Sequence, residues 1–305
     1  MNKILEELTD ILQKTQGGLR EAIKQTTHME VIGKGYMIYS KSDIPKPMLC
    51  VHLDTINTHR DKIKINPKRD FEYDENLGIL GLTKDSKLTC LGGDDRAGVW
   101  IALAMIDYME ASGDYKYDVG FFEDEEIGCL GSTSYHKDIK EIGINTTCYI
   151  GLDRKSGKGA QEVALYGDDN QELVSVFNKL GYVTDMGSVT DASNLSGDVA
   201  CVNLSVGYDN EHTSSEVLYL HCMVDTLEKL KALKLPTENF AVEYDHFYDN
   251  DPWSAQYACG SVGGLSDWYT DELEEENEIM RGALKALDID VDTLLKVSKG
   301  HLYDV

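Results

Sequence analysis

Basic residues are scarce in this sequence. It has 29 Lys and Arg residues against 54 Asp and Glu residues, which gives a formal net charge of -25 at pH 7. A phosphate backbone or an anionic membrane surface is repelled by such a chain unless its few basic residues are locally concentrated. We therefore expect neither nucleic acid nor a membrane as a partner. Metal ions and cationic groups are the partners that this charge balance favours.

Paired cysteines and long apolar runs are also missing. The seven cysteines include no Cys-x-x-Cys pair, and Cys50, Cys148 and Cys201 lie inside apolar runs, which is typical of reduced, buried residues. No apolar run is long enough to cross a membrane, and the opening segment MNKILEELTDILQK carries acidic residues throughout, unlike a signal peptide. A cytoplasmic protein is the expectation that follows.

The pattern of apolar residues predicts an α/β fold. Short apolar runs at Met48–Leu53, YDVGFFED, CYIGLD and ACVNLSVGY alternate with amphipathic, helix-like segments. Runs this continuous are buried on both faces, which indicates a mostly parallel mixed sheet sandwiched by helices. In such sheets ligands bind at the carboxyl ends of the strands.

Polar clusters stand where these apolar runs stop. Each alone is typical of a surface pair, a turn with a helix N-cap, or a solvated acidic loop. Together they place two imidazoles and several carboxylates at one edge, where the carboxylates would repel one another. Divalent cations remove this conflict, and nitrogen and oxygen ligands without thiolate suit two zinc ions that share a carboxylate, with cobalt or manganese also fitting. The clusters are His52 and Asp54 after MLCV, Asp94 and Asp95 after LTCLGG, Glu125 and Glu126 after VGFFED, Asp153 after CYIGL, and His212 after VNLSVGYDNE.

Five motifs in this region resemble an ordered set known from one enzyme clan. VHLDT, LGGDDRAGV, FEDEEIGCLGS, IGLD and EHTSSE are similar to the motifs of the co-catalytic dinuclear zinc exopeptidases, which include peptidase T, relatives of aminoacylase and carboxypeptidase G, and the lidless zinc aminopeptidases. The resemblance covers about Met48 to Leu235 and implies the phosphorylase/hydrolase-like fold of that clan. It further implies that His52 and Asp153 hold one zinc, that Glu126 and His212 hold the other, that Asp94 bridges both, that Asp54 orients His52, and that Glu125 is the general base. A cis peptide bond between Asp94 and Asp95 is expected on the same ground.

The resemblance predicts a metal-dependent hydrolase that cleaves short peptides, as an aminopeptidase or a di- or tripeptidase. An N-acyl amino acid deacylase and a non-catalytic peptidase-like binding protein remain alternatives. A binding protein that had lost its metals should show gaps at the ligand positions, and this sequence shows none. DDRAG and EEIG also resemble the aminopeptidase branch that oligomerises, which makes a homo-oligomer a candidate state.

Two regions depart from the clan's best-known members. Only 59 residues separate Asp153 from His212, so the lid or dimerisation domain that many members insert here is missing. Within this interval, Asp191 of TDASNLSG is interpreted either as a helix cap or as a residue that supports the site from behind or binds substrate. We divide the chain into a catalytic domain, 1–235, and an acidic C-terminal extension, 236–305, with a helix predicted from Asp271.

Overall fold

The computed structural model describes residues 2–41, 43–56, 65–166, 170–197 and 199–235. The acidic C-terminal extension and its predicted helix lie outside these residues.

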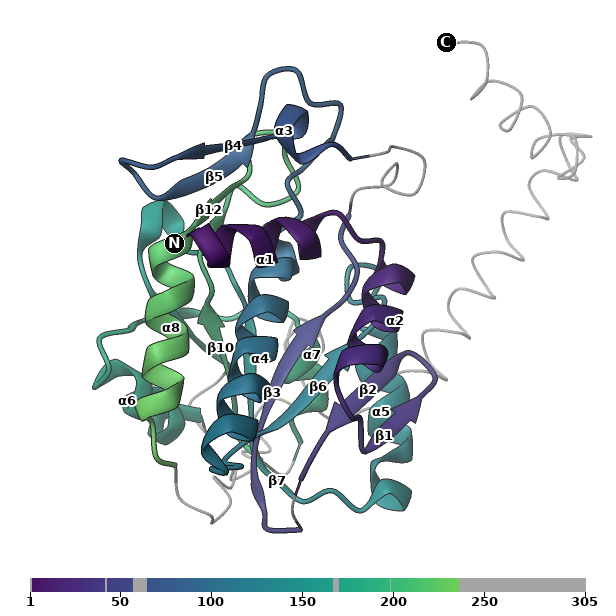
Figure 1. Cartoon of the computed structure of the whole chain (residues 1–305). Helices are drawn as coiled ribbons and strands as arrows, with labels where there is room; N and C mark the ends of the chain where they lie inside the picture. Colours follow the sequence, from purple (N-terminus) through teal and green to yellow (C-terminus); the bar gives the residue numbers. More distant parts are fainter. Residues whose placement is uncertain (1, 42, 57–64, 167–169, 198, 236–305) are drawn as a thin grey trace, which may run out of the picture. The chain divides into compact units, whose positions relative to one another are not determined.

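The described residues build an eight-stranded mixed sheet (Figure 1). Its central strands β6, β3, β7 and β10 are parallel, β2 and β8 flank them in antiparallel pairing, and β1 and β9 form the edges. The predicted α/β fold with a mostly parallel mixed sheet is therefore confirmed. In spatial order the strands are β1 (Val31–Gly33), β2 (Tyr36–Tyr39), β6 (Asp118–Phe122), β3 (Lys46–His52), β7 (Thr146–Arg154), β10 (Cys201–Ser205), β8 (Glu162–Leu165) and β9 (Val183–Met186).

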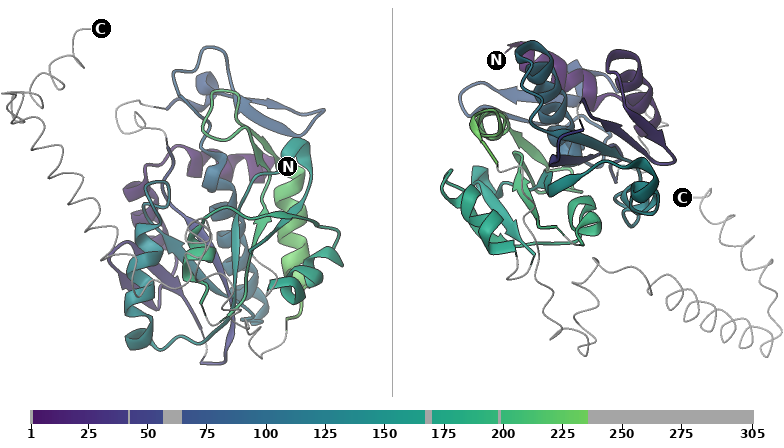
Figure 2. Two further views of the ribbon diagram at one scale, coloured as in Figure 1. Left: turned by 180° about the vertical axis from the view of Figure 1, so that it is seen from behind. Right: turned by 90° about the horizontal axis from the view of Figure 1, so that it is seen from below.

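Helices cover both faces of this sheet (Figures 1 and 2). On one face, side chains of α1 (Asn2–Leu12), α4 (Gly93–Ser112) and α8 (Leu220–Ala232) join the larger apolar core. On the other, α5 (Leu130–Ile142) and α7 (Asp191–Leu195) pack on a second cluster. Two further helices, α2 (Gln16–Thr26) and α6 (Gln171–Asn178), add side chains to the larger core.

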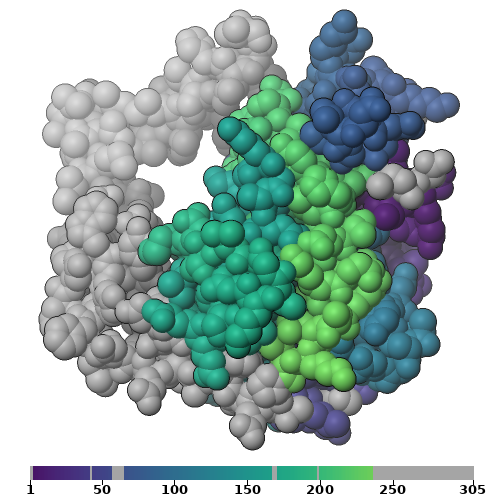
Figure 3. Space-filling model, turned by 90° about the vertical axis from the view of Figure 1, so that its left-hand side faces the viewer, coloured from purple at the N-terminus to yellow at the C-terminus, as the bar shows by residue number. Residues whose placement is uncertain are grey.

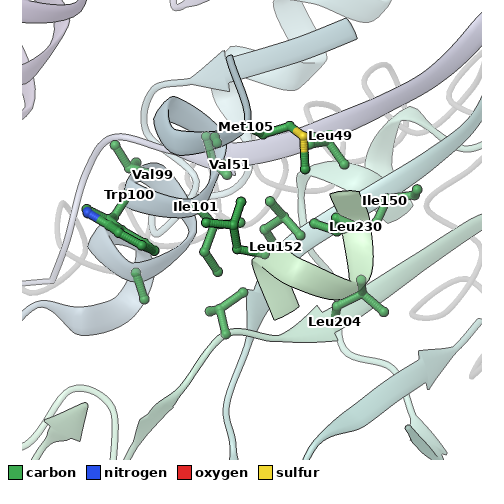
Figure 4. Close-up of a cluster of buried hydrophobic side chains, with 14 of the residues drawn as sticks. Leu49, Val51, Val99, Trp100, Ile101, Met105, Ile150, Leu152, Leu204 and Leu230 are labelled. Atoms are coloured by element: carbon green, nitrogen blue, oxygen red, sulfur yellow. The ribbon is translucent and has the colours of Figure 1, made fainter. Parts of the chain in front are cut away.

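Strand β3 shows why the sheet is buried on both sides. Its successive side chains alternate between faces, as the pleat requires. Leu49 and Val51 enter the core beneath α4 and α8, whereas Met48 and Cys50 enter the cluster beneath α5 and α7. Figure 4 shows the first of these cores, where side chains of β3, β7 and β10 meet those of α4 and α8. A strand in this position has no polar face, so its first polar side chains come at its ends.

A small second sheet stands beside the carboxyl edge of the main one. Its order is β11 (Tyr208–Asp209), β12 (Val217–Tyr219), β5 (Ile79–Leu82) and β4 (Phe71–Asp74), all antiparallel, and the short helix α3 (Pro67–Asp70) precedes β4. The segment between β3 and α4 thereby pairs with the segment that carries His212. In Figure 3 the hairpin of β4 and β5, drawn in blue, stands above the face formed by α8 and its neighbours.

None of the helices in the described part of the chain combines the length and apolar character needed to span a bilayer.

Candidate metal centre

The carboxyl ends of three parallel strands and the start of α4 meet at one edge of the main sheet. His52 is the last residue of β3 and pairs in register with Phe122, the last residue of β6. Asp153 lies one residue before the end of the neighbouring strand β7. Asp94 stands in the first turn of α4, where the backbone is not yet helical and the peptide bond to Asp95 is cis, as expected. Parallel pairing therefore brings together residues from distant parts of the chain.

Asp94 lies between two imidazoles. Its Oδ1 is 3.0 Å from His52 Nε2, and its Oδ2 is 3.1 Å from His212 Nε2. Each imidazole also faces a second carboxylate: His52 Nε2 is 3.5 Å from Asp153 Oδ1, and His212 Nε2 is 3.0 Å from Glu126 Oε1. The five residues form two donor sets that share one carboxylate, with one oxygen of Asp94 on each side. The described residues thus contain groups that can bind metal.

The electrostatics of these groups fit a divalent cation. Burial, with Asp94 close by, raises the pKa of Glu126 to about 7 and that of Asp153 to about 6. Hydrogen bonding to Asp94, with Glu126 beside it, raises the pKa of His212 to about 9. Without a metal, the nearby imidazoles offset part of the charge on these carboxylates. Divalent cations favour deprotonated nitrogen and oxygen donors and would offset this charge more fully.

Other groupings of the same donors also lie close together. His52, Asp95 and Asp153, and likewise His52, Asp94 and Glu126, offer ligand atoms within 4.8 Å of one another. Asp95, however, is already occupied: its Oδ2 accepts the backbone N–H of His52 at 3.2 Å, and its Oδ1 accepts that of Gly98 at 3.0 Å. We therefore interpret Asp95 as the residue that fastens the start of α4 to the end of β3. Sequence reasoning gave it no role.

Asp54 links two of the loops that carry donors. Its Oδ1 lies 3.1 Å from His52 Nδ1 and accepts the backbone N–H of Glu125, while its Oδ2 accepts that of Glu126, both at 3.0 Å. Burial acts to raise the pKa of Asp54, but these donors together lower it, so the carboxyl is ionised. An ionised partner accepts from Nδ1–H and leaves the Nε2 lone pair of His52 free to bind a metal.

Glu125 and Glu126 point to different places. Glu126 contacts His212, whereas Glu125 Oε1 lies 3.8 Å from the thiol of Cys129 and is not paired with either imidazole. Burial raises the pKa of Glu125 to about 9, with His52 acting in the opposite direction. One of these neighbouring carboxylates is thus placed among the metal donors, and the other remains beside them.

Asp191 begins α7 but does not cap it. The N-cap is Thr190, one residue earlier, whose backbone N–H donates to Ser193 Oγ at 2.9 Å. Asp191 is only 4% exposed, and apart from Ser132 no described residue lies near enough to hydrogen-bond its carboxylate. Burial raises its pKa to about 7, and His52 opposes this rise. Its oxygens are shielded from solvent.

A tyrosine that sequence reasoning missed holds Asp153. The hydroxyl of Tyr208 donates to Asp153 Oδ1 at 3.0 Å, the same oxygen that faces His52. Arg96, which is fully buried, donates to the carbonyl oxygens of Leu53 and Asp54. Neither residue stands out in the sequence, because a tyrosine in an apolar run usually packs in the core and an arginine near a helix start usually lies at the surface.

Comparison with solved structures identifies the fold. The aminopeptidase PepT of Bacillus cereus matches with a TM-score of 0.53 at 13% identity, over 76% of this chain and 97% of that one. A TET aminopeptidase from a marine sediment archaeon of the Thaumarchaeota gives 0.57 at 12% identity, over 78% and 99%. The Pyrococcus horikoshii TET1 peptidase, described as assembling into a tetrahedron or a large octahedral shell, gives 0.53 at 15% identity, over 75% and 98%.

These matches establish that the chain has the fold of the PepT and TET aminopeptidases. They do not test the predicted likeness to aminoacylase or carboxypeptidase G. No family model matches the sequence, and no curated protein matches it.

Proposed function

We propose that this protein is a dinuclear metallopeptidase that removes amino-terminal residues from short peptides. The observation that carries the proposal is the position of Asp94, with one carboxylate oxygen facing His52 and the other facing His212. In an ordinary surface cluster of acids, we would not expect each oxygen of one buried carboxylate to face a different imidazole. The shared fold with PepT and TET aminopeptidases supports the same reaction class.

The donor sets fit two metal ions, which we assign as zinc, with cobalt and manganese as alternatives. His52 and Asp153 would hold one ion, Glu126 and His212 the other, and Asp94 both. When bound, the ions supply Lewis acidity: they polarise the scissile carbonyl and lower the pKa of water.

The remaining steps fall to the chain's own residues. Glu125 stands next to Glu126 but is not paired with either imidazole, so we assign it as the general base that takes the proton of the attacking water. Its raised pKa would fall beside bound cations, which would leave the carboxyl ionised for this role. The same carboxyl then returns this proton to the leaving amine. Asp54 holds His52 by its Nδ1 atom, which keeps Nε2 directed at Asp94. Asp191, shielded from solvent, is assigned to support these groups from behind.

Charge favours a free amino terminus over an N-acyl group. Seven carboxyl groups gather in this region, and such acidic surroundings suit a substrate ammonium better than a substrate carboxylate. An N-acyl amino acid offers no ammonium and needs a cation for its carboxylate. Arg154 is committed to Glu162 and Asp185, and Arg96 to backbone carbonyls. The seven are Asp54, Asp94, Asp95, Glu125, Glu126, Asp153 and Asp191.

The catalytic domain is assigned to residues 1–235. The described residues between Asp153 and His212 form β8, α6, β9, α7, β10 and β11, all of which belong to the two sheets and their helices. No lid occurs among them. The metal site should then be open on the side that a lid would cover, unless the extension 236–305 or a second copy of the chain closes it. Because the TET1 peptidase with this fold assembles into large shells, we include a homo-oligomer in the proposal.

One panel of assays tests the proposal. The protein is stripped with a chelator, reloaded separately with zinc, cobalt or manganese, and assayed against aminoacyl amides, dipeptides, tripeptides and N-acetyl amino acids. We expect metal-dependent release of amino-terminal residues and no turnover of the N-acetyl compounds. Cleavage of N-acetyl amino acids alone would make the protein a deacylase. Metal binding without turnover of any compound would support a binding protein instead.

A further inference from the structure

Glu216 is a buried carboxylate beside the metal centre that has no part in the mechanism above. It is 1% exposed and immediately precedes β12. Its Oε2 accepts the backbone N–H of Gly92 at 2.8 Å, and its Oε1 accepts that of Asp94 at 3.0 Å. The side chain therefore grips the turn that presents the bridging carboxylate.

Close packing surrounds this contact. A Cβ atom at Gly93 would lie 3.0 Å from Glu216 Oε1 and 3.0 Å from Leu218 Cγ. Glycine at this position lets the turn approach the carboxylate closely. The two amides also stand at the beginning of α4, where the helix dipole favours a negative charge and offsets part of the cost of burying one.

The contact closes a loop that carries His212. Tyr208 on β11 pairs with Leu218 on β12, so the two ends of the segment between these strands lie side by side. His212 lies in the intervening segment, four residues before Glu216, with a positive φ of 63°. Through Glu216 the far end of this loop is fixed to the backbone of Asp94, whose Oδ2 faces the imidazole of His212.

We propose that Glu216 is a positioning residue that sets the separation between Asp94 and His212, and so forms the second metal position before any metal binds. This inference rests on the proposed two-metal site. The hydrogen bonds of Glu216 go to backbone amides rather than to the proposed ligand atoms, so it acts through the backbone of Asp94 and the loop of His212. Its replacement should therefore weaken one ion more than the other.

Two variants break the contact from opposite sides. Glu216→Gln keeps the size of the side chain but turns an amide NH₂ group toward one of the two backbone amides. Gly93→Ala keeps the carboxylate and displaces it by its new methyl group. The matched control is Asp70→Asn, another buried carboxylate that accepts a backbone amide, from Asn66 at 2.7 Å, and lies in the helix–strand turn before β4.

The readout is metal binding rather than hydrolysis. Titration of the metal-stripped protein with zinc should give two bound ions per wild-type chain. In both variants the ion held by Glu126 and His212 should bind more weakly by a factor of roughly 10 to 100, a range typical of residues that orient metal ligands. The affinity for the ion held by His52 and Asp153 should change less. The visible bands of the cobalt-loaded protein should shift in both variants and stay unchanged in Asp70→Asn.

Two equivalents bound by both variants with wild-type affinity and unchanged cobalt bands would overturn the inference and leave the proposed function standing. Failure of the wild-type chain to bind two ions would instead remove the proposed function. If the variants do not fold, hydrogen exchange in the wild-type metal-free protein decides the matter. The amides of Gly92 and Asp94 should be strongly protected, and rapid exchange at both would show that Glu216 does not hold them.

Discussion

Asn203 on β10 binds the main chain of Asp153 on β7 from both sides. Its Oδ1 accepts the backbone N–H of Asp153 at 2.9 Å, and its Nδ2 donates to the carbonyl oxygen of Asp153 at 2.6 Å. The regular pairing of β7 with β10 shifts register just beyond Asn203. The amide side chain replaces the missing strand–strand hydrogen bonds at the residue that faces His52, and so fixes one of the proposed metal donors.

Replacing Asn203 with Leu should destabilise the protein and weaken one metal position. The change leaves the N–H and C=O of Asp153 buried without these partners, at a cost of about 1–3 kcal/mol for each group. Urea unfolding of the metal-stripped protein measures the loss of stability, and zinc titration measures the affinity for metal. Asn178→Leu, at an exposed position of α6, is the control and should change stability by less than about 0.5 kcal/mol. Equal behaviour of the two variants would contradict the role given to Asn203.

Replacing Glu125 with Gln should abolish turnover without removing metal. All five proposed donors stay in place, but the proton acceptor is lost, so kcat should fall by a factor of roughly 100 to 10,000. Metal analysis and steady-state kinetics of the same preparation test this.

Replacing Glu126 with Gln should give the opposite pattern. This change removes a charged donor that lies 3.0 Å from His212, so one ion should bind more weakly and activity should partly return at high zinc or cobalt concentration. If the Glu125 variant loses metal and the Glu126 variant keeps both ions, base and ligand have been exchanged in our assignment. If neither change affects any hydrolytic rate, the catalytic proposal itself is wrong.

Stability should depend on pH through a buried ion pair at the opposite edge of the sheet. Lys46 Nζ lies 3.3 Å from Asp118 Oδ1, and burial raises the pKa of Asp118 to about 6 although Ser40 and Lys46 oppose this. The folded state therefore holds this proton at a higher pH than the unfolded chain. The group's contribution to the free energy of unfolding consequently falls as the pH rises from its ordinary value of 3.8 toward about 6.

Lys46→Met removes the cation and should raise the pKa of Asp118 further. The contribution of Asp118 to the free energy of unfolding should then continue to fall at higher pH. We expect a loss of about 3–5 kcal/mol relative to wild type at pH 8, when an unpaired buried charge remains, and a clearly smaller loss at pH 5. Urea unfolding of both chelated proteins at the two pH values gives the difference. The double variant Lys46→Met with Asp118→Leu should recover most of the stability, and a single-variant loss independent of pH would refute this account.

Removal of the segment after Pro236 tests the domain assignment. A chain that ends there retains all five proposed metal donors, so its zinc content should be unchanged. If the acidic extension covers the metal site or joins subunits, the shortened protein should differ in substrate selection or in mass in solution. Unchanged kinetics together with unchanged mass would exclude that covering role.

The sequence was most informative where chemistry and secondary structure coincide. Apolar runs that end in His or Asp predicted β3 and β7 and the edge at which His52 and Asp153 meet. The run LTCLGG forms no strand, and Asp94 comes to this edge from the first turn of α4. Parallel pairing makes such a prediction possible, because every strand then delivers its last residue to the same side.

Features that depend on tertiary packing were not predicted. Glu216 and Gly92 are 124 positions apart in the sequence, and no local sequence pattern predicts their contact. The polar segment after His52 suggested no strands, yet β4 and β5 form there because β12 supplies a partner for β5. The apolar pattern of Glu30–Tyr39 favours a strand, whereas the structure forms a hairpin of β1 and β2 that reverses at Gly35 with a φ of 81°.

The small sheet also determines which part of the metal centre a shortened chain can contain. His52, Asp94, Glu126 and Asp153 have all been synthesised by the end of β7, whereas His212 and the strand β12 that frames its loop come near the end of the described residues. An N-terminal fragment that stops at Gly207 would hold the complete donor set of one ion and an incomplete set for the other. In the proposed site, translation would thus complete the two donor sets in a fixed order, and the set that contains His212 would be completed last.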